Sequence, residues 1–176
     1  MKRTIAAALA FLAPAAHAEV VSVTPSGFAI ESKAVVTATP AEAYAMLGRV
    51  DAWWDGAHSY SGDAANLRIE MKPGGCFCER VPDGDGAVEH MRVVQLRPGA
   101  MLRLQGGLGP LQGEGVSGTL TWALKPVAGG TEIIQTYVVG GYIRGGAEAW
   151  AKPVDGVMAG QLARLARRLG ENVPTP

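Results

Sequence analysis

The last long segment of the chain, residues 147–169, repeats its apolar residues every three or four positions. This is the period of an amphipathic helix, and Gly170 is the residue type that commonly follows a helix end. The apolar stripe consists of Trp150, Val154, Met158, Leu162, Leu165 and Leu169. A helix of this length has to bury its stripe against another layer of structure, so the nature of that layer decides the fold.

The chain before this helix alternates apolar and polar residues, which predicts β-strands separated by turns rich in Gly, Pro and Asp. We expect six to seven strands, at residues 28–37, 67–72, 76–81, 88–96, 101–105, 116–125 and 131–140. The Gly-rich residues 106–115 predict a loop or a bulged strand pair. They do not predict a phosphate site, because no Lys-Ser/Thr pair and no helix follow them.

Two short helical segments are expected after the first strand. The first begins with the capping-box pattern of Thr39 and Glu42, and the second is a further turn through Trp53 and Trp54. The element order predicts an α+β domain. In it, a curved antiparallel sheet covers the C-terminal helix. The space between that helix and the short helices is where we expect an apolar cavity.

Residues 1–18 have the three parts of a secretory signal peptide. Lys2 and Arg3 precede an apolar run over residues 5–16, and small residues stand before a cleavage site after Ala18. The alternatives are a membrane anchor or an ordinary buried helix, but the apolar run is too short to span a bilayer. We therefore expect a periplasmic or secreted protein without a membrane anchor after cleavage.

The length of 176 residues suits one domain. We expect a leader at 19–26, one ligand-binding domain at 27–170 and a disordered tail at 171–176. The chain has 16 basic and 16 acidic residues, and loss of Lys2 and Arg3 leaves two more acidic than basic ones. Such a charge gives no long-range attraction to nucleic acid or to an anionic membrane, so neither is an expected partner.

Cys76 and Cys78 stand two positions apart on a predicted strand, so both side chains point to the same face. A disulfide between them would need a local distortion of the strand. A zinc site would need further ligands, and the mature chain offers only His58 and His90, so no metal is expected. Two small cysteines that pack on the strand are the favoured interpretation, and their redox state stays open.

The chain resembles the START-like helix-grip superfamily, also called the SRPBCC or polyketide cyclase/dehydrase-like group, over about residues 27–169. The resemblance is closest to the branch similar to the activator of a heat-shock chaperone ATPase. It is carried by the element order and by three runs, Trp53–Asp55 with His58–Asp63, Gly74–Glu79 and Tyr137–Tyr142. The resemblance implies a helix-grip fold and a cavity for apolar or amphipathic small molecules. It implies no single reaction.

Four residues are candidates for chemistry: His58, Tyr60, Glu79 and His90. His58 and Tyr60 stand in a loop, where His could act as an acid or base and Tyr could donate a hydrogen bond. The alternative is that His58 caps a turn and Tyr60 packs at the rim of the cavity. If Glu79 faces inward it is a buried carboxylate with a raised pKa, and otherwise it is solvated or ion-paired. A neighbouring strand could place His90 or Arg92 beside it, and an ion-paired structural role for Glu79 is the favoured interpretation.

A larger set of mostly apolar residues is expected to line the cavity, although the same residues could equally fill a plain core. With the candidates for chemistry, the expected ligand-binding residues are Trp53, Trp54, His58, Tyr60, Phe77, Glu79, Met91, Leu104, Trp122, Tyr137, Tyr142, Trp150, Val154 and Met158. A Ser-His-Asp triad is not supported, because the chain lacks Gly-x-Ser-x-Gly.

Three functions remain open from the sequence. The favoured one is a non-catalytic binder of a small apolar molecule that needs no cofactor. The second is a cyclase, dehydratase or isomerase that acts on a carbonyl substrate. The third is a modulator of a chaperone ATPase, which the predicted export signal argues against because that partner and its ATP are cytosolic. The oligomeric state is not predicted.

Overall fold

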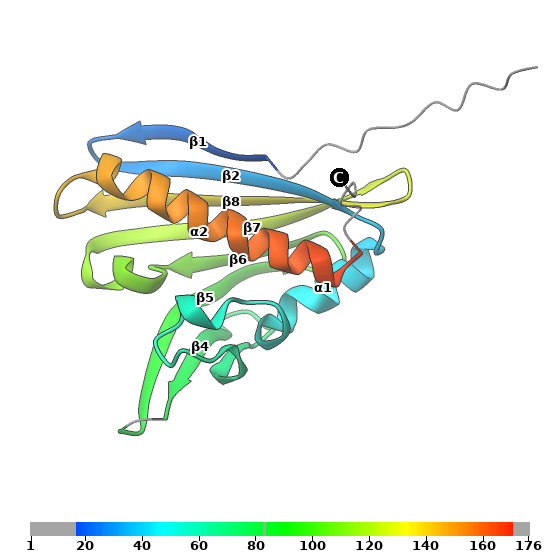
Figure 1. The fold of residues 1–176 in the computed structure, drawn as a ribbon, viewed down its shortest axis with the longest axis horizontal. Helices are drawn as coiled ribbons and strands as arrows, with labels where there is room; N and C mark the ends of the chain where they lie inside the picture. Colours follow the sequence, from blue (N-terminus) through cyan, green and yellow to red (C-terminus); the bar gives the residue numbers. More distant parts are fainter. Residues whose placement is uncertain (1–16, 83, 171–176) are drawn as a thin grey trace, which may run out of the picture.

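The computed structural model describes residues 17–82 and 84–170. Its centre is one eight-stranded antiparallel sheet with the strand order β1-β2-β8-β7-β6-β5-β4-β3 (Figure 1). The strands are β1 His17–Thr24, β2 Gly27–Val36, β3 Leu67–Ile69, β4 Cys76–Val81, β5 Gly86–Arg97, β6 Met101–Gly106, β7 Gly115–Val127 and β8 Gly130–Tyr142. The predicted α+β class and the helix-grip arrangement are confirmed.

Two α-helices and four short 3₁₀ helices complete the described chain. They are α1 Pro40–Gly48, η1 Val50–Ala52, η2 Gly56–His58, η3 Ala64–Asn66, η4 Gly109–Gly113 and α2 Ala147–Arg168. In Figure 1, α2 lies across β2, β8 and β7, and the sheet continues beyond it to β5 and β4. No helix in residues 17–82 and 84–170 is long and apolar enough to cross a membrane.

Local sequence signals account for where the helices begin and end. The capping box is present, because the hydroxyl of Thr39 accepts from the backbone N–H of Glu42 and the Glu42 carboxylate accepts from the backbone N–H of Thr39. At the other end of the chain, Gly170 has a φ of +76°, in the left-handed region that Gly adopts without strain. Both signals were readable in the sequence.

The strand that was not expected is β1, which pairs antiparallel with β2 at one edge of the sheet. It includes most of the predicted leader, residues 19–26, and it starts before the predicted cleavage site after Ala18. Residues 1–16 of the predicted signal peptide and the predicted tail at 171–176 lie outside the described residues. A further difference is η4, which occupies part of the Gly-rich segment predicted as a loop or bulged strand pair.

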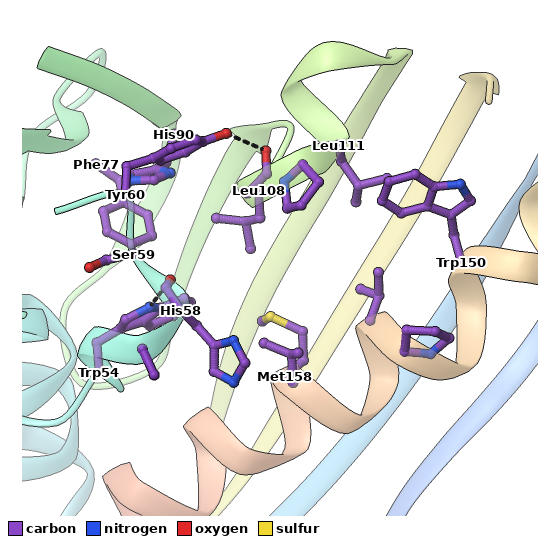
Figure 2. Close-up of a pocket in the computed structure, with 16 residues that line it drawn as sticks. Trp54, His58, Ser59, Tyr60, Phe77, His90, Leu108, Leu111, Trp150 and Met158 are labelled. Atoms are coloured by element: carbon purple, nitrogen blue, oxygen red, sulfur yellow. Dashed lines mark hydrogen bonds between the residues drawn. The ribbon is translucent and has the colours of Figure 1, made fainter. Parts of the chain in front are cut away.

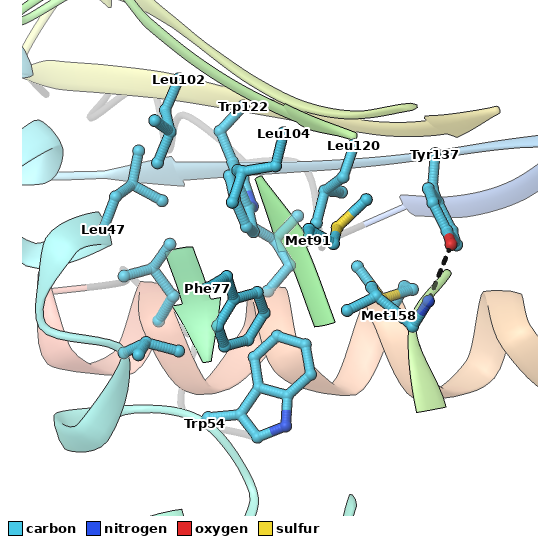
Figure 3. Packing of buried hydrophobic residues seen from close by; sticks show 14 of the residues in the cluster. Leu47, Trp54, Phe77, Met91, Leu102, Leu104, Leu120, Trp122, Tyr137 and Met158 are labelled. Carbon is cyan, nitrogen blue, oxygen red and sulfur yellow. Dashed lines mark hydrogen bonds between the residues drawn. The ribbon is translucent and has the colours of Figure 1, made fainter. Parts of the chain in front are cut away.

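The core lies between the sheet and α2 (Figure 3). A buried polar relay connects the two layers inside it. The indole N–H of Trp122 on β7 donates to the Gln135 carbonyl oxygen at 2.8 Å, and the Gln135 amide donates to the Met158 backbone carbonyl of α2 at 2.9 Å. Each polar group of this relay is satisfied, so the relay fixes the position of α2 without leaving an unpaired donor.

Candidate functional site

A cavity of about 380 Å³ opens between α2, the segment around η2 and the segment around η4 (Figure 2). Its size is within the range of small-molecule sites. Its wall is formed by Trp54, Ala57, His58, Ser59, Tyr60, Phe77, His90, Leu108, Gly109, Pro110, Leu111, Trp150, Pro153, Val154, Val157 and Met158. Most of these side chains are apolar, so the cavity suits an apolar body that carries few polar groups.

The structure brings about half of the predicted ligand-binding residues together in this wall. They are Trp54, His58, Tyr60, Phe77, Trp150, Val154 and Met158, and the candidate His90 joins them. Trp53, Met91, Leu104 and Trp122 lie in the core instead, as Figure 3 shows for the last three. Tyr142 lies at the end of β8 with 73% of its surface exposed, so it does not line the cavity.

His90 reaches the wall because β5 contains a bulge at this point. Phe77 pairs with Met91 and the adjacent Cys78 pairs with Glu89, so His90 has no partner on β4. The extra residue breaks the alternation of the strand, and His90 and Met91 are both buried although they are neighbours. Bulges of this kind turn a side chain to a new direction and are frequent beside functional sites.

Glu79 lies on the inward face of β4 with none of its surface exposed. Its carboxylate accepts from the backbone N–H of Ser61 and, at 3.1 Å, from that of Tyr60. Its Oε2 also lies 3.0 Å from Nε2 of His90. Burial acts to raise the pKa of Glu79, but these hydrogen bonds outweigh it and the pKa lies below its ordinary value. The sequence left the orientation of Glu79 open, and the raised pKa that it predicted for an inward-facing Glu79 is wrong.

The hydrogen bond to Glu79 determines which nitrogen of His90 carries the proton. The ionised carboxylate only accepts hydrogen bonds, so Nε2 of His90 donates to it. Burial lowers the pKa of His90, and the carboxylate opposes this shift only in part, so the ring is neutral at pH 7. Nδ1 is therefore an acceptor, and it is buried without a hydrogen-bond partner among residues 17–82 and 84–170.

Tyr60 lies over the hydrogen-bonded pair of His90 and Glu79, at the mouth of the cavity, with 52% of its surface exposed. Its ring is stacked on the His90 imidazole with 5.9 Å between ring centroids. Its hydroxyl donates to the Gly109 carbonyl at 3.0 Å and so connects the two loops that border the cavity (Figure 2). His58 is an exposed wall residue, and its carbonyl accepts from the indole N–H of Trp54 at 3.0 Å.

The wall around η4, from Leu108 to Leu111, was not predicted from the sequence. Leu108 and Leu111 are buried. Two leucines three residues apart inside a Gly-rich segment were the sequence signal that could have identified this wall. Tyr137 supports them from the core, because its hydroxyl accepts from the Leu108 N–H at 3.1 Å and donates to the Gly106 carbonyl at 3.3 Å. Burial raises the pKa of Tyr137 to about 12, so this hydroxyl stays protonated.

The opposite wall belongs to α2, where Pro153 and Val157 are cavity residues that were also missed. Val157 follows the predicted Val154 by one helical turn, so the helical spacing could have identified Val157 as a cavity residue. The η2 segment is tied to this helix. The backbone N–H of Asp55 donates to Gln161 at 2.8 Å, and the Asp55 carboxylate pairs with Arg164 at 2.7 Å. These contacts hold the loop with His58 and Tyr60 against α2.

Cys76 and Cys78 form a disulfide in the structure, with 5.3 Å between their Cα atoms. The interpretation as two separate packing cysteines is therefore wrong. The distance is within the usual range for a bridge, and the strand pairing shifts its register at this point, which supplies the required distortion. The Glu89 carboxylate lies close to both sulfurs. A bridged sulfur is not the thiolate that binds metals, so these three residues do not make a metal site while the bridge is closed.

Comparison with known families agrees with this arrangement of sheet and helix. Residues 27–170 match the family model described as polyketide cyclase / dehydrase and lipid transport. The chain belongs to this family. No curated protein matches this family member. The resemblance to the chaperone-activator branch stays a prediction from the sequence.

Solved structures share the fold of this polyketide cyclase/dehydrase family member at low sequence identity. CalU16 from Micromonospora echinospora is 13% identical, with 91% of this chain and 86% of that one covered and a TM-score of 0.59. Mll3558 from Rhizobium loti is 22% identical, with 84% and 99% covered and a TM-score of 0.58. DynU16, a protein in the dynemicin biosynthetic locus, is 17% identical, with 80% and 46% covered and a TM-score of 0.56.

Proposed function

We propose that this protein binds a small apolar or amphipathic molecule in the cavity between α2 and the two loops. The observation that carries the proposal is a space of about 380 Å³ with a mostly apolar wall in a chain of this size. Removing apolar surface from water is favourable, so an apolar ligand that covers this wall would gain binding free energy.

The distribution of polar groups favours an amphipathic ligand. His58, Ser59 and Tyr60 lie along one segment of the wall, whereas Leu111, Val154 and Met158 line other parts of it. A molecule with one polar end and an apolar body would match both parts. Membership of a family described by cyclisation, dehydration and lipid transport supports a ligand of this kind.

The test uses a fluorescent apolar probe, 2-naphthol, with two variants of α2. Val157→Trp adds an indole to the cavity wall, and Ala149→Trp adds the same group at an exposed position of the same helix. We expect saturable binding to the wild type and to Ala149→Trp, and at least tenfold weaker binding to Val157→Trp. Native mass spectrometry after gentle purification would identify a resident ligand. Equal binding to both variants would place the probe elsewhere and contradict the proposal.

A second candidate is an enzyme of the cyclase, dehydratase or isomerase kind acting on a carbonyl substrate. The observation that favours it is the neutral His90, held by Glu79 in the cavity wall. An imidazole oriented by a carboxylate is a common general base. The test is the exchange of α-hydrogens of 2-tetralone into D₂O, followed by NMR. Exchange above the buffer rate that disappears in His90→Leu would support catalysis, and exchange equal to buffer would leave binding as the function.

We also propose that the chain is exported, on the basis of residues 1–18. Expression of the full chain in a Gram-negative host, followed by fractionation and intact-mass measurement, tests this. A periplasmic product that begins at Glu19 is the expected result. A cytosolic product that keeps residues 1–18 would contradict export, and it would make the chaperone-modulator function worth testing.

A further inference from the structure

The buried Nδ1 of His90 has no hydrogen-bond partner within the described residues. His90 has 5% of its surface exposed, and it is one of the residues that line the cavity. Buried polar atoms of proteins nearly always have a partner, because an unsatisfied one loses its hydration without compensation. A donor supplied by a ligand in the cavity would satisfy the acceptor that the described residues leave unpaired.

The surroundings of the ring make Nδ1 a selective acceptor. Two backbone N–H groups, from Tyr60 and Ser61, hold the Glu79 carboxylate in place, and that carboxylate holds Nε2–H of His90. The ring can therefore neither rotate nor change its tautomer without breaking hydrogen bonds in a buried site. A group that offers only a lone pair, such as an ether oxygen, would meet another lone pair at Nδ1.

Tyr60 covers one face of the ring that carries this nitrogen. Its ring is stacked on the imidazole, and apart from its backbone it is held by one hydrogen bond, from its hydroxyl to the Gly109 carbonyl. Half of its surface is exposed, so the side chain can swing outward without a large loss of packing. The other face of the site is apolar, with Phe77 at 5.1 Å from the His90 ring centroid.

We infer that the cavity selects molecules that carry an O–H or N–H donor on an apolar ring or chain, and that Nδ1 of His90 receives this donor beneath the side chain of Tyr60. The inference rests on the proposed binding function and adds the class of ligand to it. Glu79 is the positioning residue, because it acts on the ligand only through the orientation and tautomer of His90.

The test compares two probes of similar shape, 2-naphthol, which has a hydroxyl donor, and 2-methoxynaphthalene, which has none. The measured quantity is the ratio of their dissociation constants for the same protein preparation, by fluorescence titration at pH 7.5. A variant that merely loosens the fold weakens both probes and leaves the ratio unchanged. For the wild type we expect 2-naphthol to bind about tenfold more tightly, the effect of one buried hydrogen bond.

Three variants attribute the preference to its source. His90→Leu removes the acceptor, so the ratio should fall to about one. Glu79→Gln should also reduce the ratio, since an amide no longer obliges Nε2 of His90 to donate. Gln105→Leu changes an exposed residue of β6 that does not line the cavity and should keep the wild-type ratio. If either His90→Leu or Glu79→Gln fails to fold, the other still provides the test.

The outcomes separate this inference from the proposed function. Equal binding of both probes to the wild type overturns the inference and leaves cavity binding intact. A preference that survives in His90→Leu assigns the donor to another acceptor and overturns it as well. If neither probe binds the wild type, the proposed function fails and the inference fails with it.

Discussion

The ring of Tyr137 on β8 occupies the space in which a side chain at Gly118 on β7 would lie. An ideally placed Cβ on Gly118 would be 2.6 Å from the Tyr137 hydroxyl oxygen and 2.7 Å from Cζ. This close approach lets the hydroxyl reach the backbone on both sides of the cavity loop, at Gly106 and Leu108. The glycine thus contributes to the shape of the cavity from the layer behind it.

Gly118→Ala should therefore destabilise the fold by about 1–3 kcal/mol, the usual cost of overpacking a buried site. The control is Gly140→Ala on β8, where an added Cβ meets only the Ser26 carbonyl at 3.7 Å. That variant should stay within about 0.5 kcal/mol of the wild type. Urea unfolding of the three proteins measures the difference. Equal stability of the two variants would contradict the packing described here.

The free energy of unfolding should fall on acidification because of His90 and Glu79. Both have a pKa below the ordinary value in the folded chain, so the unfolded chain binds more protons. The His90 contribution is present above its unfolded pKa of about 6.5 and is lost as the pH falls from there through the lower folded pKa. The Glu79 contribution is lost below about pH 4.3 in the same way.

The measurement is urea unfolding of the wild type and of His90→Gln across pH 8 to 5. The wild type should lose stability in this window, and the variant should lose less of it because a neutral side chain replaces the imidazole. Parallel curves for the two proteins would show that His90 is protonated alike in the folded and unfolded chains.

Gln135→Leu should cost about 1–3 kcal/mol, since it leaves the buried indole N–H of Trp122 without an acceptor. It also removes the donor to the Met158 carbonyl on α2, so the cavity wall should loosen with it. Gln105→Leu makes the same substitution at an exposed residue of β6 and should have little effect on stability. Thermal unfolding followed by circular dichroism distinguishes the two. A Gln105 variant as unstable as the Gln135 variant would argue against the relay.

Tyr60→Phe should speed up both the association and the dissociation of 2-naphthol several-fold. The substitution keeps the ring over His90 but removes the hydrogen bond to Gly109 that holds it across the cavity mouth. Stopped-flow fluorescence measures both rates, and the dissociation constant should change less than either. Unchanged rates would mean that the side chain does not limit access.

The Cys76–Cys78 bridge should be present in protein purified without reductant. Unfolding in excess iodoacetamide should then add no carbamidomethyl group, whereas prior reduction should allow two, as measured by intact mass. Because the bridge closes a loop with a single intervening residue, its loss should destabilise the fold less than the loss of a long-range disulfide. Two alkylated cysteines without reduction would show that the thiols are free.

Periodicity alone predicted most of the architecture, because side chains on one face of an element repeat with that element's own geometry. The strand at Cys76–Val81 and the start of α2 at Ala147 agree with the prediction at the residue. The stripe of α2 also identified Trp150, Val154 and Met158, which line the cavity. The leader was not recognised as a sheet strand, because an edge strand with one neighbour is specified by that pairing more than by its own pattern.

The sequence by itself determined the order of the strands and α-helices from β2 to α2, the stripe of α2 and the fact that Phe77 and Glu79 share one face of β4. Only the tertiary structure decided that this face is inward and that a bulge turns His90 toward the cavity beside Glu79. It also decided the sign of the Glu79 pKa shift. Burial and hydrogen bonding act in opposite directions on a carboxylate. The donors that outweigh burial, at Tyr60, Ser61 and His90, come from other segments that only the folded chain brings together.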